Sequence, residues 1–478
     1  MKSIALNMHD QNAYDGDVHW QYERHSRIKK HWYFNSHREF YNKEFLPYWN
    51  SDEHFAWSYT TGGLKQIQEA FKPHDKLIRE YNKSYSSLWD NLQLDNFYYI
   101  DHHQSHAAYA LLHSEFKEAD ILAIDGRGTE YNAVFFNKNG IALVLDKLPI
   151  GSLWNYCCRC VGLEGLSAAG KLMGLVGYGE YNQAIYDSLW IIFDTSTNGS
   201  RNPVMNKDNR ADVAFTLQQF TLDRIKEQVV PLRTSDNLCL AGGVIYNGYL
   251  NEFLQQYWPN VHIPPAVGDE GQALGSYMHA EYVLNNHRHI PETYCGPRYD
   301  LPDNDINYHE IAQEIANGKI VGWFQGRSES GNRALGNRSI LADPRNPNMK
   351  DIINSKIKLR EDWRPFAPSV LEEHYQDYFD TRTPSPYMSR IVPVISDEIP
   401  GVTHVDRTAR IQTVNINQNK KFYKLINAFH EITGVPMLLN TSFNCREPIV
   451  ETPEDAHATF EKCELDVLVI GSDVIKWI

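Results

Sequence analysis

The sequence predicts an α/β protein, because short apolar runs lead repeatedly into polar loops that contain glycine. The run ILAID at residues 121–125 predicts a buried strand that ends at Asp125, directly before a Gly-Arg-Gly loop. The run KSIALNMHD at residues 2–10 is built alike and ends near His9, and this echo predicts two related α/β halves. Since ligands of open α/β sheets bind at the carboxyl ends of strands, both loops are candidate site regions.

Length and composition restrict the class of protein further. With 478 residues the chain is too long for one ordinary core, so we expect two or three domains. The net charge of −14 argues against a protein that coats nucleic acid or anionic membranes by general attraction. The N-terminus has no apolar core of signal-peptide length, and no apolar run reaches the roughly eighteen residues of a membrane span. We therefore expect a soluble, cytoplasmic protein.

Two histidines and two aspartates predict a metal site. His102 and His106 stand four apart in a segment rich in alanine and leucine, so on a helix both imidazoles share one face. Such a pair alone is more often plain helix surface. Asp125 at the end of the following strand and Asp269 in the turn of PPAVGDEGQALG add two candidate carboxylate ligands. Imidazoles combined with hard oxygen ligands suit iron, manganese or zinc.

One glycine-rich segment predicts a place where an anion approaches the backbone closely, and another predicts a strand-end loop. Lys171 lies between Gly170 and Gly174, in a segment without the spacing of a P-loop. The small residues around this lysine permit contact with a phosphate or carboxylate, and an ordinary surface lysine is the equal alternative. The apolar run NLCLA enters Gly242-Gly243, with Asn247 beyond, and predicts a second strand-end loop.

Cysteine usage and one basic stretch carry weaker signals. The chain has seven cysteines, an odd number that favours reduced thiols. Cys157, Cys158 and Cys160 lack a second Cys/His pair at zinc-finger spacing, so we expect ordinary thiols rather than a metal site. The basic stretch at residues 24–30 is either a solvated face or a surface for a phosphorylated substrate.

The second half of the chain predicts a pocket for a polyanion. A proline-rich stretch at residues 289–306 predicts a linker between domains at residues 1–288 and 307–478. In the second domain the cations are concentrated in loops rich in glycine, serine, asparagine and proline rather than on helix faces. They include Arg327, Arg333, Arg338, Arg345, Lys358, Arg360, Arg364, Arg410 and Arg446. Arginine forks bind phosphate oxygens in pairs, which favours this interpretation over a solvated surface.

With these residues in view, the chain resembles the NodU/CmcH family of O-carbamoyltransferases over nearly its whole length. The resemblance is carried by HHQSHAA, AIDGRGTE, AAGKLMGLVGYG, LAGGVIYN, VGDEGQALG, GWFQGRSESGNRALGNRSILADPR, RPFAPSV, HVDRTARIQTV and GVPMLLNTSFN with REPIV. The chain departs from the family pattern at residues 9–12, where HDQN replaces HDAS, and at residues 22–24, where YER replaces an EER-type motif. It also has SGNRALG in place of FGPRALG and NCREP in place of NxRGEP.

The resemblance implies a fold and an activity. The N-terminal domain would have the actin-like ATPase fold, a duplicated ribonuclease-H-like α/β fold, and the C-terminal domain a YrdC-like α/β fold. The C-terminal domain would combine carbamoyl phosphate with ATP, in the presence of Mg²⁺, to give carbamoyl adenylate. The N-terminal domain would transfer the carbamoyl group to an acceptor hydroxyl at a bound metal, Fe²⁺ or another divalent ion. The chain would thus be an ATP-dependent O-carbamoyltransferase.

The resemblance also implies site residues. The metal ligands would be His102, His106, Asp125 and Asp269. The N-terminal nucleotide pocket would contain Lys171, Gly242, Gly243 and Asn247. The adenylate-forming pocket would contain Arg327, Arg333, Arg338, Lys358, Arg364, His404, Arg410, Asn440, Ser442, Asn444 and Arg446. The expected catalytic groups are His9 as a base, Asp125, Lys171 and Arg338.

Other functions stay open at this point. A tRNA-modifying threonylcarbamoyl enzyme would share the actin-like fold and also use an acyl adenylate. A non-catalytic nucleotide-binding protein would bind ATP without turnover. The acceptor of a carbamoyltransferase would be either a natural-product hydroxyl or a hydroxymethylated pyrimidine, 5-hydroxymethylcytosine, in phage-type nucleic acid. The oligomeric state is not fixed by the sequence, and a homodimer is one option.

Overall fold

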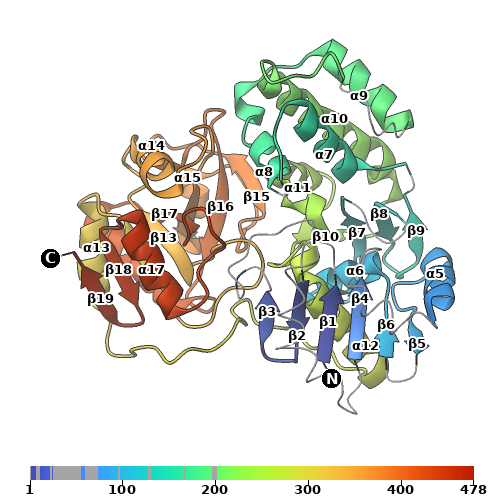
Figure 1. Ribbon diagram of the computed structural model, residues 1–478, viewed down its shortest axis with the longest axis horizontal. Coiled ribbons are helices and arrows are strands. Elements are labelled where there is room, and N and C mark those ends of the chain that lie inside the picture. The colour runs from blue at the N-terminus through green and yellow to red at the C-terminus, as the bar shows by residue number, and fades with distance from the viewer. Residues whose placement is uncertain are drawn as a thin grey trace. The chain divides into compact units, whose positions relative to one another are not determined.

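The computed structural model describes residues 2–6, 11–21, 24, 55–59, 74–94, 97–126, 131–145, 147–165, 167–195 and 202–477. The chain divides into two compact units, Met1–Glu292 and Thr293–Ile478 (Figure 1). His9 and, apart from Arg24, the basic stretch at 24–30 lie outside the described residues. Arg24 is buried.

The strands of the first unit form two mixed sheets. They are β1 (Lys2–Leu6), β2 (Gln11–Tyr14), β3 (His19–Gln21), β4 (Phe55–Tyr59), β5 (Leu92–Leu94), β6 (Phe97–Tyr99), β7 (Asp120–Ile124), β8 (Ala133–Phe136), β9 (Ala142–Val144), β10 (Asn237–Ala241) and β11 (Asn260–His262). The first sheet has the order β3-β2-β1-β4-β6-β5 and the second the order β9-β8-β7-β10-β11. In Figure 1 the first sheet contains the blue strands at the N-terminus.

The two sheets repeat one topology. In the first, β3, β2 and β1 pair in antiparallel, and β4 and β6 then add in parallel to β1. In the second, β9, β8 and β7 pair in antiparallel, and β10 and β11 add in parallel to β7. The shared order confirms the prediction of two related α/β halves. It is the arrangement of the duplicated ribonuclease-H-like, actin-like fold.

Helices α6 (His102–His113) and α12 (Gln272–Asn285) join the two halves. Helix α12 packs on β1 and β4, helix α6 packs on β7 and β10, and the two helices pack on each other. Their contact is close, because a Cβ atom on Gly275 would lie 2.0 Å from the backbone oxygen of Ser105. The Ser105 hydroxyl donates to the carbonyl of Gln272 at 2.8 Å. A glycine is therefore required at position 275 for this crossing.

The rest of the first unit is mainly helical. Its further helices are α5 (Asp75–Ser84), α7 (Ile150–Cys160), α8 (Ala168–Met173), α9 (Gln183–Thr195), α10 (Arg210–Gln228) and α11 (Gly248–Leu254). In α7, Cys157 and Cys158 are buried and Cys160 is half-buried, and all seven cysteines of the chain are free thiols. Within the described ranges, no helix is both long and apolar enough to cross a membrane.

The second unit is built on one eight-stranded sheet of order β15-β16-β14-β17-β13-β12-β18-β19. Its strands are β12 (Val321–Phe324), β13 (Arg338–Ala342), β14 (Ala367–Leu371), β15 (Arg390–Pro393), β16 (Thr408–Val414), β17 (Met437–Ser442), β18 (Val467–Ile470) and β19 (Asp473–Lys476). Its helices are α13 (Tyr308–Ala316), α14 (Met349–Ile352), α15 (Tyr375–Tyr378), α16 (Lys420–Thr433) and α17 (Pro453–Cys463), and a π-helical segment spans Ile353–Lys358. Trp323 and Phe422 are among the fully buried side chains of its core.

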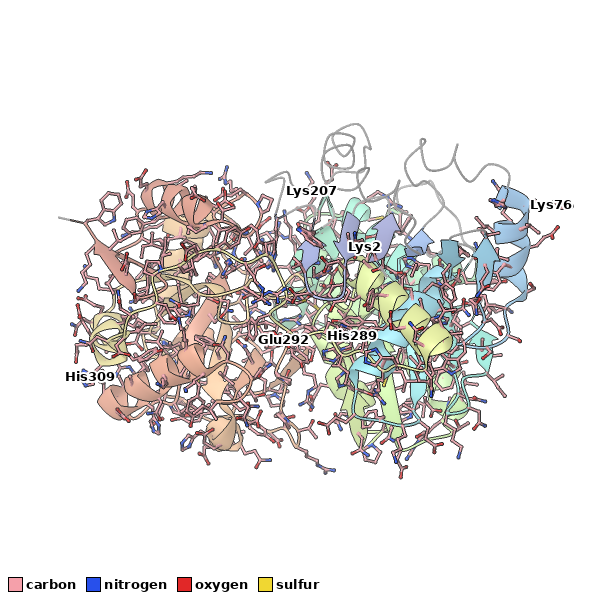
Figure 2. All side chains as sticks on the ribbon, turned by 90° about the horizontal axis from the view of Figure 1, so that it is seen from below. Lys2, Lys76, Lys207, His289, Glu292 and His309 are labelled. Atoms are coloured by element: carbon pink, nitrogen blue, oxygen red, sulfur yellow. The ribbon has the colours of Figure 1, made fainter. Side chains whose placement is uncertain are left out.

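The stretch that we expected to be a linker packs partly on each unit. In the first unit, the Tyr14 hydroxyl and His289 Nε2 form a hydrogen bond of 2.6 Å. Figure 2 labels His289 and Glu292, the last residue of this unit in the sequence. In the second unit, the Gly296 amide donates to the carbonyl of Ser328 at 3.0 Å. The functional division at residues 289–306 and the YrdC-like fold of the second unit stay predictions.

The close helix crossing gives a testable prediction. Gly275→Ala forces a methyl group against the Ser105 carbonyl, and we expect it to lower the free energy of unfolding by about 1–3 kcal/mol, as overpacking of a core does. Urea unfolding measures this change. Gly170→Ala is the matched control, because a Cβ atom there meets nothing within 4 Å. Equal stability of the Gly275→Ala variant and the wild type would contradict the packing described.

Candidate active site

Four side chains of the first unit meet with their ligand atoms close together: His102, His106, Asp125 and Asp269. The Nε2 atoms of His102 and His106 lie 3.2 and 3.1 Å from Asp125 Oδ2, and both lie 3.3 Å from Asp269 Oδ1. Each of the four residues offers one ligand atom, and these four atoms all lie within 4.8 Å of one another. In the part of the chain that the structure describes, no other group of three or more His, Cys, Asp or Glu side chains has this geometry.

Helix α6 holds the two imidazoles one turn apart and is fixed at both ends. Asp101 and Gln104 form a capping box at its start, in which the Asp101 carboxylate accepts from the His103 amide at 2.9 Å. At the other end, the guanidinium of Arg288 donates to the carbonyls of Leu111 and Leu112 at 3.0 and 3.1 Å. The helix is buried from its first residue to its last turn, so the imidazoles have little freedom to move.

Asp125 is placed by the parallel pair β7 and β10. It follows the last residue of β7, and Gly242 and Gly243 follow the last residue of β10, the parallel neighbour of β7. Gly242 has a φ of 96°, and a Cβ atom there would lie 2.2 Å from the carbonyl oxygen of Ile124. A Cβ atom on Gly243 would lie 2.9 Å from Asp125 Oδ1. The two predicted glycines therefore allow the loop to pass closely over Asp125.

Asp269 begins a 3₁₀ turn, Asp269–Gly271, that leads into α12. Two buried amide side chains hold this turn. The Gln272 amide nitrogen donates to the carbonyl of His102 at 3.0 Å, and the Asn12 amide nitrogen donates to the carbonyl of Asp269 at 2.8 Å. Sequence reasoning named neither amide as a site residue, although Asn12 ends the HDQN motif that departs from the family pattern.

The electrostatics of the cluster favour a cation. Burial alone lowers the pKa of His106, but hydrogen bonds and charge interactions with Asp125 and Asp269 outweigh burial and raise this pKa to about 9. Burial alone raises the pKa of Asp125, but His102 and His106 hold it well below its usual range. The half-buried Asp125, the buried Asp269 and the two buried imidazoles can thus bind either a proton on an imidazole or a divalent metal ion.

Two further residues predicted for the first unit, Asn247 and Lys171, are not among the four residues of this cluster. Asn247 is buried and caps α11, where its side-chain oxygen accepts from the Leu250 amide at 3.1 Å and its amide nitrogen donates to Gln218 at 2.8 Å. Lys171 is half-buried on the short helix α8. Their roles in nucleotide binding stay predictions.

In the second unit, Lys358 and a loop after β17 form a compact polar group. The ammonium of Lys358 donates to the carbonyls of Ser442 and Asn444 at 2.5 and 2.9 Å, and to the Asn444 side-chain oxygen at 2.8 Å. Burial, with Arg360 and Arg364 nearby, lowers the pKa of Lys358 well below its usual range. The crowding of cations here favours an anionic ligand.

Arg364 and Arg446 belong to the same region. Arg446 is exposed, and its guanidinium donates to the carbonyl of Leu359 at 3.1 Å. The Arg364 side chain is 29% exposed and lies 3.6 Å from Glu361, and burial lowers its pKa. Arg360, which the sequence placed among the cations but not in the site, has its pKa lowered to about 9 by burial and by Arg364.

Arg338, predicted to be catalytic, is fully buried. Its guanidinium donates to the carbonyls of Gln325 and Gly326 at 2.7 and 3.1 Å and lies 3.6 Å above the ring of Phe324. Glu329 supports the same loop, because its carboxylate accepts from the amide of Leu335 at 2.6 Å. In this structure Arg338 thus organises the glycine-rich loop, and direct contact with a substrate stays a prediction.

Of the remaining predicted pocket residues, Asn440 lies in β17 and Arg410 in β16, whereas Arg327, Arg333 and His404 lie in loops. Asn440 is buried, and its amide donates to Ser369 and Gln412 at 2.9 and 3.1 Å. Arg327 donates to the carbonyl of Gly296 at 2.7 Å, and Arg410 donates to that of Met388 at 2.9 Å. His404 is buried and Arg333 is half-buried.

Segments of both units match known protein families. Residues 28–201 and 193–278 match the family described as carbamoyltransferase N-terminus, and residues 312–476 match carbamoyltransferase C-terminus. The chain belongs to the carbamoyltransferase family. This assignment confirms the resemblance seen in the sequence and identifies the protein as a carbamoyltransferase.

Curated relatives extend the same match. The nodulation protein NolO of Bradyrhizobium diazoefficiens is 34% identical over 434 residues, which cover 79% of this chain and 79% of that protein. The nodulation protein NolNO of Sinorhizobium fredii is 36% identical over 436 residues, 79% of this chain and 64% of that protein. Among solved structures, a 2-hydroxyisocaproyl-CoA dehydratase activator from Clostridium difficile aligns at 14% identity with a TM-score of 0.36, over 60% of this chain and 96% of that one.

The raised pKa of His106 predicts how the metal-free carbamoyltransferase responds to pH. The pKa lies above the value of 6.5 in the unfolded chain, so the charged imidazole stabilises the fold fully below pH 6.5. This contribution is lost as the pH rises through about 9. We expect the free energy of unfolding, measured in urea with a chelator present, to fall across this window.

His106→Gln is the control for that measurement, because glutamine keeps a polar side chain but does not titrate. The variant should show a flatter dependence between pH 6.5 and about 9. An unchanged pH dependence in the variant would show that another group titrates there.

Proposed function

We propose that this carbamoyltransferase is an ATP-dependent O-carbamoyltransferase with a metal centre in its first unit. The proposal rests mainly on the cluster of His102, His106, Asp125 and Asp269, in which three residues are buried and Asp125 is half-buried. Two imidazole nitrogens and two carboxylate oxygens make a mixed donor set that suits Fe²⁺, and also Mn²⁺ or Zn²⁺. All four residues belong to the region that matches the carbamoyltransferase N-terminus.

The residues present fit a bound divalent ion. The ligand atoms converge from a rigid helix, a strand end and a turn, and both imidazoles direct Nε2 toward the carboxylates. An ion held by these four groups would act as a Lewis acid that polarises the carbamoyl carbonyl. To bind it, His106 must give up the proton that the two carboxylates stabilise in the metal-free protein.

The transfer step needs an acceptor hydroxyl and a leaving group. The hydroxyl oxygen attacks the carbamoyl carbon, the bond from that carbon to the phosphate oxygen of carbamoyl adenylate breaks, and AMP leaves. The hydroxyl proton passes to a base, for which His9 is our proposal from the sequence. His102, His106 and Asp269 are buried, and charge interactions are stronger away from bulk water.

The activation step is assigned to the second unit. Water hydrolyses carbamoyl phosphate to carbamate and inorganic phosphate, a carbamate oxygen then attacks the α-phosphorus of ATP, and pyrophosphate leaves. Both reactants are anions, so cations must offset their repulsion. Arg364 and Arg446 are accessible cations beside Lys358, and with Mg²⁺ they would hold the phosphates.

The division of labour predicts the effect of removing one ligand. We expect His106→Ala to reduce carbamoyl transfer by more than the ~100-fold typical of losing an outer partner of a metal ligand. Release of pyrophosphate from ATP and carbamoyl phosphate should stay within about threefold of the wild type. His113→Ala on the same helix is the control. Loss of both activities together in a folded His106→Ala protein would refute the division.

A second prediction concerns the cations of the second unit. Arg364→Gln and Arg446→Gln should each slow pyrophosphate release about 10–100-fold, because each removes a charged hydrogen-bond donor worth about 1.5–3 kcal/mol. The exposed Arg382→Gln is the matched control in the same unit. Normal rates in both pocket variants would place the activation step elsewhere.

A direct assay distinguishes between the two classes of acceptor. Mass spectrometry of amino sugars and other natural-product alcohols, against oligonucleotides that contain 5-hydroxymethylcytosine, detects the mass added by a carbamoyl group. The net charge of −14 favours a small acceptor over duplex nucleic acid. Modification of the oligonucleotide alone would reverse that choice.

A further inference from the structure

One buried amide, on Asn12, joins the first sheet to the turn that carries Asp269. Asn12 lies in β2 and is 2% exposed. Its side-chain nitrogen donates to the Asp269 carbonyl at 2.8 Å, and its side-chain oxygen accepts from the Ala273 amide at 2.8 Å. One side chain therefore spans the 3₁₀ turn Asp269–Gly271 from its first residue to the start of α12.

These two contacts fix the backbone on both sides of the Asp269 carboxylate. The Ala273 amide belongs to the first turn of α12, where backbone amides have no partner within the helix. The Asp269 carbonyl belongs to the residue whose carboxylate lies 3.3 Å from both imidazoles. With the backbone held from β2, the Asp269 side chain keeps the direction that brings Oδ1 to His102 and His106.

An amide is suited to this position because it donates and accepts at once. Alanine would leave a buried carbonyl and a buried amide without their partners. Aspartate would still accept from Ala273, but it would bring an oxygen against the Asp269 carbonyl. The neighbouring contact from Gln272 to the His102 carbonyl completes the link from β2 through the turn to α6.

We propose that Asn12 is a positioning residue for the metal centre and sets the reach of Asp269 toward the two imidazoles. This inference rests on the proposed metal site and assigns a role to the residue at which the HDQN motif ends. Asn12 acts through Asp269 and touches no ligand atom itself. Loss of such an outer partner typically weakens metal binding about 10–100-fold.

Ser3 supplies a matched control. It is 1% exposed in β1, and its hydroxyl donates to the carbonyl of Ala273 at 2.6 Å. Ser3 thus holds the same first turn of α12 from the same sheet, but it makes no contact with the Asp269 carbonyl. Ser3→Ala shows how a loosened start of α12 by itself affects metal binding. Asn12→Ala also removes the contact to the Asp269 carbonyl, so the difference between the two variants measures the effect of that contact.

The experiment titrates Co²⁺ into the metal-free full-length wild type and its Asn12→Ala and Ser3→Ala variants, at one pH. The visible absorption of bound Co²⁺ reports both the affinity and the geometry of the site. We expect Asn12→Ala to bind about 10–100-fold more weakly, with an altered spectrum, and Ser3→Ala to stay within about threefold of the wild type. Urea unfolding of the metal-free proteins should show similar destabilisation of both variants.

Other outcomes would test the positioning role of Asn12 and the metal centre separately. Equal affinities of Asn12→Ala and Ser3→Ala would overturn the positioning role. Failure of the wild type to bind Co²⁺, Fe²⁺ or Zn²⁺ at all would overturn the metal centre itself. If Asn12→Ala does not fold, Asn12→Ser, which keeps a hydroxyl in β2, is compared with Ser3→Ala by the same criteria.

Discussion

Two carboxylates approach the same two imidazoles inside the first unit and require a positive charge to offset their repulsion. The packing of the surrounding elements depends on this requirement. Asp125 and Asp269 approach the same two imidazoles to within 3.3 Å. Isolated buried charges are costly, so the cluster persists only with a protonated imidazole or a bound metal ion. The close crossing of α6 and α12 at Gly275 and the glycines beside Asp125 serve to bring these four side chains together.

Much of this centre follows from the sequence, because its ligands sit where local rules apply. The i, i+4 spacing placed His102 and His106 on one face of α6, and the end of an apolar run placed Asp125 beyond β7. The two halves were visible as an echo between strands. The amides of Asn12 and Gln272 were not, because their partners are backbone carbonyls far away in the chain, and only the tertiary fold brings these together.

In the second unit the sequence located the cations but did not assign their roles. The strand register brings the start of β13 beside the ends of β12 and β17, since Phe324 pairs with Arg338 and Ser339 pairs with Ser442. Segments far apart in sequence thus meet at one sheet edge. An arginine fork can donate to backbone carbonyls as well as to phosphate oxygens. A glycine-rich loop therefore does not reveal that Arg338 is buried against carbonyls while Arg446 is exposed.

The most direct test of the metal centre is anomalous X-ray scattering from crystals of the carbamoyltransferase loaded with Fe²⁺ or Co²⁺. We expect one strong peak in the first unit, at about 2.0–2.2 Å from a ligand atom of each of His102, His106, Asp125 and Asp269. The peak should disappear in crystals of His106→Ala grown with the same metal. A peak bound by other residues, or none in a well-ordered cluster, would contradict the account.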